Sequence, residues 1–191
     1  LGPMFTTMST ITIAVTALGD LAGRPPVRRD GARPGDVVAL AGRIGYAAAG
    51  YTVLSRGFRS PRLLVEAYRR PVVPYPAGPQ AAQLGATAMI DVSDGLVADL
   101  GHIAAASGVR VDVDRDALEV PDTLHDTAAA FAVDPYSWIL SGGEDHALVA
   151  TFPAGVTLPA QWRVIGRVTD GSGVTVNGEP YRARPGWEHF R

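Results

Sequence analysis

The sequence predicts an α/β (α+β) protein in which a mixed sheet is covered by helices. The first observation is that residues 86–90 have the apolar composition of a buried strand. Residues 95–106 follow with apolar side chains at helical spacing, and residues 109–113 alternate valine with polar residues, as a second strand does. A strand, a helix and a strand in this order match a βαβ unit.

The composition is that of an ordinary globular enzyme. Of the 191 residues, 47% are hydrophobic and 19% are charged, which is enough apolar material for one large domain. The net charge is −2, from 17 basic and 19 acidic residues, so neither sign favours a nucleic acid or a membrane as partner. No apolar run reaches the roughly 18 residues that would span a bilayer. The lack of cysteine excludes disulfides and thiolate chemistry, and we expect a cytoplasmic protein.

Three consecutive parts are expected along the chain. Residues 1–10 lack a periodic pattern, and Leu1–Pro3 before Met4 resemble the remnant of a cleaved tag. Residues 11–22 contain the alternation of apolar and polar side chains that is typical of a half-buried strand. Residues 23–191 are expected to form the α/β domain itself.

Within this domain the expected elements follow one another in a simple order. A loop rich in Arg, Pro and Gly at residues 23–36 leads into a buried strand at residues 37–41. Two helices are expected next, at residues 42–57 and 61–70. A proline-rich linker at residues 71–79 and a short helix at residues 79–84 follow. After the βαβ unit, two helices are expected at residues 122–132 and 135–140. Three strands are expected after them, at residues 147–152, 162–169 and 174–176. A turn at residues 170–173 is expected to join the last two strands.

The first candidate site is the segment Asp91–Leu96, where the strand of the βαβ unit turns into its helix. Asp91 and Asp94 are three positions apart at the carboxyl end of a strand, so their oxygens can bind one hard cation. Ser93 can cap the helix, whose first N–H groups favour an anion. Together these features suit a magnesium-bound polyphosphate. The alternative is that Ser93 and Asp94 only cap a helix.

The second candidate is the segment Ser141–Asp145, in which two glycines stand beside Glu144 and Asp145. Glycines between a helix and a strand allow a close approach of two backbones, and they would present both carboxylates at one spot. The alternative is a glycine-rich helix terminus with solvated acids.

Two further features have weaker support from the residues alone. Arg28, Arg29 and Arg33 lie in one loop, and a guanidinium group can bind a nucleotide phosphate, although a basic loop can also be simply solvated. Trp187 could stack on a flat heterocycle or belong to a tail that is tucked into the core. The four histidines have no metal-ligand spacing, and no catalytic role is assigned to them.

Four segments, taken in order, resemble the thiamine-monophosphate kinase family: residues 29–36, 91–96, 141–145 and 186–190. The wider superfamily includes aminoimidazole ribonucleotide synthetase. The resemblance implies the C-terminal domain of that two-domain architecture, with residues 11–22 a leftover strand of the N-terminal domain. It also implies a homodimer for the full-length protein.

The resemblance further implies an ATP-dependent transfer of phosphate to thiamine monophosphate, which gives thiamine diphosphate and requires Mg²⁺. By position, Asp91 and Asp94 would bind the metal. Ser93 and Arg29 would contact ATP, whereas Glu144 and Trp187 would contact thiamine monophosphate. No residue is expected to act as a catalytic base, because this phosphoryl transfer depends on positioning and on neutralising charge.

The departures from the family pattern limit what this chain can do alone. The acidic motifs of the family's N-terminal domain are not in the sequence, so we expect an inactive fragment. His146 and Ala147 stand where many relatives have Tyr and Glu. Two alternatives stay open: another ATP-binding member of the superfamily, such as an aminoimidazole ribonucleotide synthetase or selenophosphate synthetase relative, and a non-catalytic ligand-binding domain.

Overall fold

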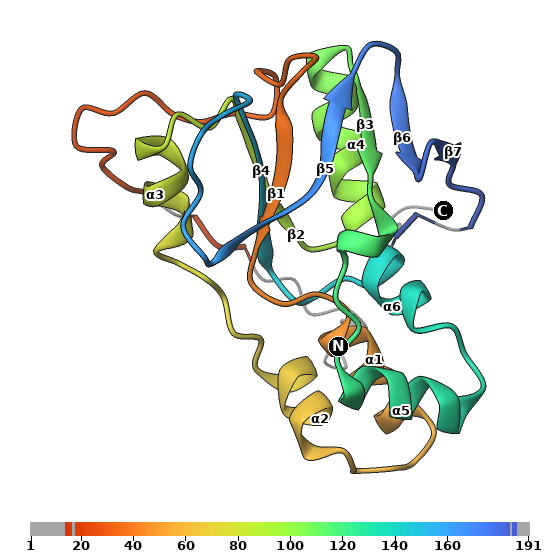
Figure 1. The fold of residues 1–191 in the computed structure, drawn as a ribbon. Helices are drawn as coiled ribbons and strands as arrows, with labels where there is room; N and C mark the ends of the chain where they lie inside the picture. The colour runs from red at the N-terminus through yellow and green to blue at the C-terminus, as the bar shows by residue number, and fades with distance from the viewer. Residues whose placement is uncertain (1–13, 17, 184, 187–191) are drawn as a thin grey trace, which may run out of the picture.

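The computed structural model describes residues 14–16, 18–183 and 185–186, and it contains one seven-stranded mixed sheet (Figure 1). The strands are β1 (Val37–Ala41), β2 (Ala88–Val92), β3 (Arg110–Val113), β4 (Ala147–Phe152), β5 (Trp162–Thr169), β6 (Gly173–Val176) and β7 (Glu179–Pro180). Their order is β2-β4-β1-β5-β3-β6-β7, and every pair is antiparallel except β3 with β6. The predicted fold class is therefore confirmed.

Helices cover the sheet and extend beyond one end of it. They are α1 (Tyr46–Ser55), α2 (Arg62–Arg69), α3 (Ala77–Gln83), α4 (Leu96–Ser107), α5 (Asp122–Phe131) and α6 (Pro135–Ser141), with a 3₁₀ turn at Arg115–Ala117. A helix was expected at each of these six places, although the one expected at residues 79–84 begins earlier, at Ala77. Figure 1 shows α1, α2 and α5 gathered beyond the end of the sheet at which β1 and β2 finish. None of the helices in the described part of the chain is long and apolar enough to cross a bilayer.

The connection between strands differs from the simplest reading of the sequence in two places. The expected unit β2-α4-β3 is present, but β4, β1 and β5 lie between its two strands. Similarly, the turn after β5 does lead to β6, yet β3 separates these strands and pairs with both. In each case the order of the elements along the chain is as predicted. The strands that pair with β2, β3 and β6, however, are not the ones that the local sequence suggested.

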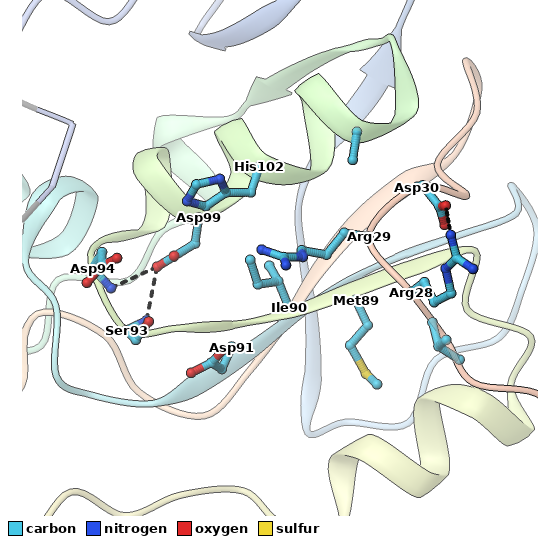
Figure 2. Close-up of a pocket in the computed structure, with 12 residues that line it drawn as sticks. Arg28, Arg29, Asp30, Met89, Ile90, Asp91, Ser93, Asp94, Asp99 and His102 are labelled. Atoms are coloured by element: carbon cyan, nitrogen blue, oxygen red, sulfur yellow. Dashed lines mark hydrogen bonds and ion pairs between the residues drawn. The ribbon is translucent and has the colours of Figure 1, made fainter. Parts of the chain in front are cut away.

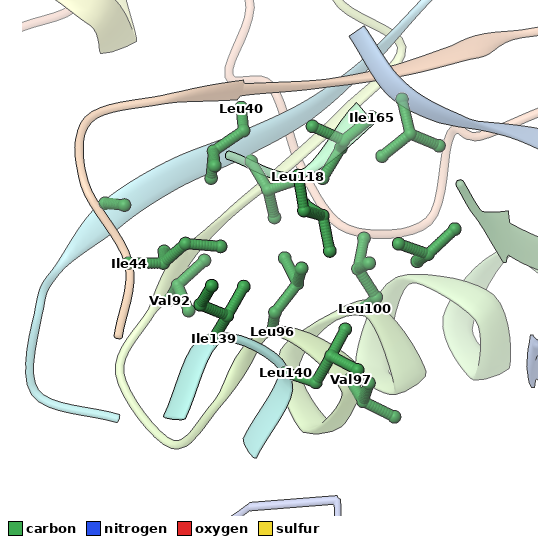
Figure 3. Packing of buried hydrophobic residues seen from close by; sticks show 14 of the residues in the cluster. Leu40, Ile44, Val92, Leu96, Val97, Leu100, Leu118, Ile139, Leu140 and Ile165 are labelled. Atoms are coloured by element: carbon green, nitrogen blue, oxygen red, sulfur yellow. The ribbon is translucent and has the colours of Figure 1, made fainter. Parts of the chain in front are cut away.

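The main core lies between the sheet and α4. Leu96, Leu100 and Ile103 lie on one face of α4, as predicted, and all three are completely buried. Figure 3 shows Leu96 and Leu100 among the side chains of this core. The opposite face of the sheet carries a smaller core under α3. In this core the rings of Phe152 and Trp162 pack edge to face, with their centroids 5.2 Å apart. The larger of the two hydrophobic cores thus lies on the face of the sheet that α4 covers.

The loop before β1 is fixed along the outer edge of β2. The N–H group of Met89 donates to the carbonyl oxygen of Arg28 at 3.0 Å, and the hydroxyl of Ser107 donates to the carbonyl oxygen of Arg29 at 2.9 Å. These bonds hold residue 29 between β2 and α4. Of the strand expected within residues 11–22, the described residues 14–16 and 18–22 belong to no strand, and the others lie outside the described residues.

Candidate functional site

The two acidic motifs lie side by side at the end of β2. The N–H group of Glu144 donates to the carbonyl oxygen of Ser93 at 2.8 Å, and that of His146 donates to Val92 at 3.1 Å. This follows from the sheet, because Val92 is paired with Ala147 at the start of β4. The segment that leads into β4 must therefore run beside the turn that leaves β2.

Glycines make this close approach possible. A Cβ atom at Gly143 would overlap the carbonyl oxygen of Ser93, and one at Gly142 would overlap that of Trp138. Gly95 has a φ of 139°, and a Cβ there would lie 2.8 Å from the carbonyl oxygen of Ser141. The expectation that the glycines serve close backbone contact is confirmed.

The turn before α4 is held by Asp99, a residue that the sequence analysis did not single out. Its Oδ2 atom accepts hydrogen bonds from the N–H groups of Ser93, Asp94 and Gly95 at 3.0, 3.0 and 3.1 Å. The side chain is buried, and burial raises the pKa of the Asp99 carboxyl although the hydrogen bonds oppose that shift.

The N-cap position of α4 is occupied by Gly95, so neither Ser93 nor Asp94 is the N-cap residue. The helix begins after Gly95, and in the described part of the chain the N–H groups of the preceding turn are bound by Asp99 rather than by a side chain of the turn. One signal in the sequence pointed to this role. Asp99 stands between Leu96 and Leu100 on the apolar face of the helix, where an acid is buried only with strong partners.

Four of the predicted site residues line one pocket of about 670 Å³: Arg29, Asp91, Ser93 and Asp94. Its walls come from the loop at residues 27–30, from β2 and from α4. Figure 2 shows the Arg29 side chain pointing into this pocket, with His102 of α4 on the other side. Arg28 instead forms an ion pair with Asp30. We call this hollow the Arg29 pocket.

Two carboxylates of the Arg29 pocket, Asp91 and Asp94, are the candidate ligands for a magnesium ion. No group of three or more His, Asp or Glu side chains within the described residues is arranged to hold a metal ion. Asp91 and Asp94 are thus a pair and not part of such a group, and the Asp91 side chain is 57% exposed. Mg²⁺ is commonly bound through one or two carboxylates, with phosphate oxygens and water completing its octahedron. A pair of aspartates in a solvent-accessible pocket suits that arrangement.

The His146 side chain lies near one acid of each motif, and the sequence analysis noted this residue only as a departure from relatives. Its Nδ1 atom lies 3.6 Å from Oδ2 of Asp91, and its Nε2 atom lies 4.0 Å from Oε2 of Glu144. Glu144 and His146 have φ values of 69° and 52°, a left-handed conformation that is uncommon for side chains of this size. Trp187 lies outside the described residues.

The two acids of the second motif face different environments. Glu144 has a side chain that is 70% exposed, as solvated acids do. Asp145 is buried, and its Oδ1 accepts a hydrogen bond from the N–H group of Ala47 at 2.9 Å, at the start of α1. Burial raises the pKa of Asp145 to about 6, although backbone hydrogen bonds and Arg43 act in the opposite direction. Asp145 therefore stabilises the start of a helix and is not presented beside Glu144.

The raised pKa of Asp145 predicts a pH dependence of stability. In the unfolded chain the carboxyl has its ordinary pKa of 3.8, so the folded state binds the proton more tightly. The stabilisation by Asp145 is complete below pH 4 and is lost as the pH rises towards 6. The difference between the pKa of 3.8 in the unfolded chain and about 6 in the folded protein corresponds to about 3 kcal/mol.

Urea unfolding of the wild type and of Asp145→Asn, measured from pH 4 to pH 7, tests this expectation. The difference in unfolding free energy between the two proteins should change by about 3 kcal/mol across this range, to the disadvantage of the wild type at pH 7. Asp126→Asn is the matched control, because the side chain of Asp126 is 82% exposed. A constant difference for Asp145→Asn would contradict the raised pKa.

Comparison with known proteins identifies the class to which this fold and site belong. Residues 33–179 match the family model of the AIR synthase related protein, C-terminal domain. The chain belongs to this family.

Within the family, the chain is similar to thiamine-monophosphate kinases. It is 51% identical to the thiamine-monophosphate kinase of Mycobacterium tuberculosis over 180 residues, which are 93% of this chain and 54% of that protein. The structure of AaThiL complexed with AMPPCP and TMP matches 86% of this chain and 54% of that chain, with 34% identity and a TM-score of 0.79. The resemblance that was drawn from the four motifs is confirmed.

The similarity also has limits. The chain spans about half the length of the curated relatives it matches. The hydrogenase maturation protein HypE of E. coli shares the fold, with a TM-score of 0.64, but it is only 18% identical, so the likeness concerns the fold alone.

Proposed function

We propose that this chain is part of an ATP-dependent kinase that converts thiamine monophosphate to thiamine diphosphate. The observation that carries the proposal is that Arg29, Asp91, Ser93 and Asp94 line one pocket. An oxygen of the acceptor phosphate would form a bond to the γ-phosphorus of ATP, while the bond from that phosphorus to the bridging oxygen breaks and ADP leaves. The acceptor oxygen is already anionic, so this transfer needs no strong base.

The residues of the Arg29 pocket would bind and orient the donor. A guanidinium group forms strong, charge-assisted hydrogen bonds to phosphate oxygens, which suits Arg29 to the triphosphate. Asp91 and Asp94 would hold Mg²⁺, and the Ser93 hydroxyl would contact the nucleotide. When bound, the metal supplies positive charge that neutralises the donor phosphates. Asp99 would keep the turn in place, because it binds three of its N–H groups.

Glu144 and Trp187 would contact thiamine monophosphate, as the resemblance implies. The position of Glu144 supports this role, since its N–H group donates to the carbonyl oxygen of Ser93, a residue that lines the Arg29 pocket. An acceptor beside Glu144 would thus lie next to a metal that is bound by Asp91.

The decisive experiment compares the full-length protein with the 191-residue chain. We expect the full-length protein to turn over thiamine monophosphate with ATP and Mg²⁺. The isolated chain should show no measurable turnover, because it spans about half the length of its relatives and the acidic motifs of the family's N-terminal domain are not in its sequence. Thiamine diphosphate is quantified by chromatography. Turnover by the isolated chain would contradict the fragment proposal, and none by the full-length protein would contradict the function itself.

A further inference from the structure

The end of the molecule that is formed by α1, α2 and α5 exposes several large apolar side chains. Tyr51 and Phe58 are each 57% exposed, Leu63 is 49% exposed and Tyr68 is 37% exposed. The rings of Tyr51 and Tyr68 contact each other, with their centroids 5.5 Å apart. Apolar groups that gather on one exposed surface mark interaction sites, whereas single exposed ones need no explanation. We call this surface, at residues 46–70 and 122–131, the helical end.

Charge is divided unevenly over the helical end. Residues 56–70, which follow α1 and include α2, contain five arginines and one glutamate, a formal charge of +4. Residues 116–134, which include α5, contain five acids and no Lys or Arg, a formal charge of −5. The whole chain carries only −2, so these two segments depart from its average in opposite directions. Figure 1 shows α2 to the left and α5 to the right of this end.

The two charged segments adjoin on one copy of the chain. α1 contacts both α2 and α5. The rings of Phe58 and Phe131 have their centroids 5.8 Å apart, and the guanidinium carbon of Arg56 lies 4.7 Å from the centre of the Phe131 ring. A positive and a negative surface are therefore held beside each other, with exposed aromatic rings between them.

The charge of Arg62 does not serve its own helix. Arg62 is the first residue of α2, where the helix dipole disfavours a cation. It is exposed, as is Asp122 at the start of α5. Neither side chain forms an ion pair with any residue that the structure describes. Opposite charges that lack a partner within the described chain indicate a partner outside it.

We propose that the helical end is an interface between two copies of the chain that are related by a twofold axis. A twofold interface uses the same surface of both copies, so α2 of each copy lies against α5 of the other. Both charged segments then face a segment of opposite charge. The exposed aromatic rings would lie in the middle of the interface, where tyrosine, phenylalanine and arginine are enriched.

Other occupants fit the charge pattern less well. An acidic protein or a nucleic acid would match α2, but the negative charge around α5 would repel it. A basic partner would have the reverse problem at α2. A second copy is the occupant that brings both charges with it, already at the spacing that the helical end requires.

The test uses the full-length protein, whose mass is measured by light scattering after size-exclusion chromatography. At low salt, Arg62→Glu should have half the mass of the wild type, because it places like charges at both copies of the contact. Raising the salt concentration should lower the mass of the wild type to the same value. A glutamate at the start of α2 is favoured by the helix dipole, so the lost association cannot be ascribed to an unfolded helix.

An exchange of charges makes the test specific to the pairing of α2 with α5. Asp122→Arg alone should also halve the mass. The Arg62→Glu and Asp122→Arg variants should associate with each other when mixed, and a chain with both changes should associate with itself, because opposite charges meet again. Arg110→Glu is the matched control, since this exposed arginine lies at the start of β3, away from the helical end (Figure 1).

The remaining outcomes would overturn the interface. One is a wild-type mass that does not depend on salt and that neither variant changes. Another is a loss of mass that neither the mixture nor the combined variant restores. Contacts that are made by the half of the relatives beyond this chain would be unaffected, so they cannot imitate the exchange.

Discussion

Replacing Asp91 or Asp94 by Asn in the full-length protein is expected to lower the rate of thiamine monophosphate phosphorylation by about 100- to 1000-fold. Both carboxylates line the Arg29 pocket, and the described residues contain no larger cluster that could hold a metal in their place. An amide keeps the shape of the side chain but carries no negative charge, so it binds Mg²⁺ weakly. Without the metal, the charge of the transferring phosphate is not neutralised.

Steady-state kinetics over a range of Mg²⁺ concentrations provides the measurement. If the carboxylates bind the metal, both variants should require more Mg²⁺ than the wild type and recover partly when it is raised. Circular dichroism should show an intact fold, since the exposed carboxylate of Asp91 is not part of the core. Asp126→Asn serves as the control. Near-wild-type rates for both variants at limiting Mg²⁺ would exclude these aspartates as metal ligands.

Gly143→Ala is expected to destabilise the protein by about 2–4 kcal/mol and to abolish activity at the same time. The added Cβ would overlap the carbonyl oxygen of Ser93, which is backbone and cannot rotate away. The two acidic motifs would have to separate, and the hydrogen bond from Glu144 to Ser93 would break. One methyl group would thereby move the turn that carries Asp94 relative to Glu144.

Gly101→Ala is a control with the opposite expected sign. Gly101 lies inside α4, and a Cβ there would meet no atom within 4 Å. Alanine favours a helix over glycine, so this variant should gain up to about 1 kcal/mol. Urea unfolding and the rate of phosphorylation are measured for both variants. A Gly143→Ala protein as stable and active as the wild type would show that the motifs do not need this close contact.

The positions of helices and strands could be predicted because they depend on the local spacing of apolar side chains. The alternating valines of β3 and the apolar stripe of α4 are examples of such patterns. The pairing of strands could not be predicted in the same way. Nothing in residues 86–113 indicates that three other strands lie between β2 and β3, since these strands come from residues 37–41 and 147–169.

The candidate site could be predicted where a motif carries the chemistry, as with the aspartates that flank Ser93. It could not be predicted where the role of a side chain depends on tertiary contacts. Asp99 receives three hydrogen bonds only because the preceding turn folds back onto it. Asp145 and Glu144 look alike in the sequence, but one is buried under α1 and the other is exposed. His146 lies between two carboxylates because β4 pairs with β2.

The left-handed backbone at Glu144 and His146 has a consequence for protein engineering. Each such residue costs about 1–2 kcal/mol relative to a right-handed conformation, and glycine would remove this cost. A search for thermostable variants should therefore favour glycine or asparagine at position 146. The same change would remove the imidazole between Asp91 and Glu144. At this position, a change made for stability therefore also alters the surroundings of two acids of the candidate site.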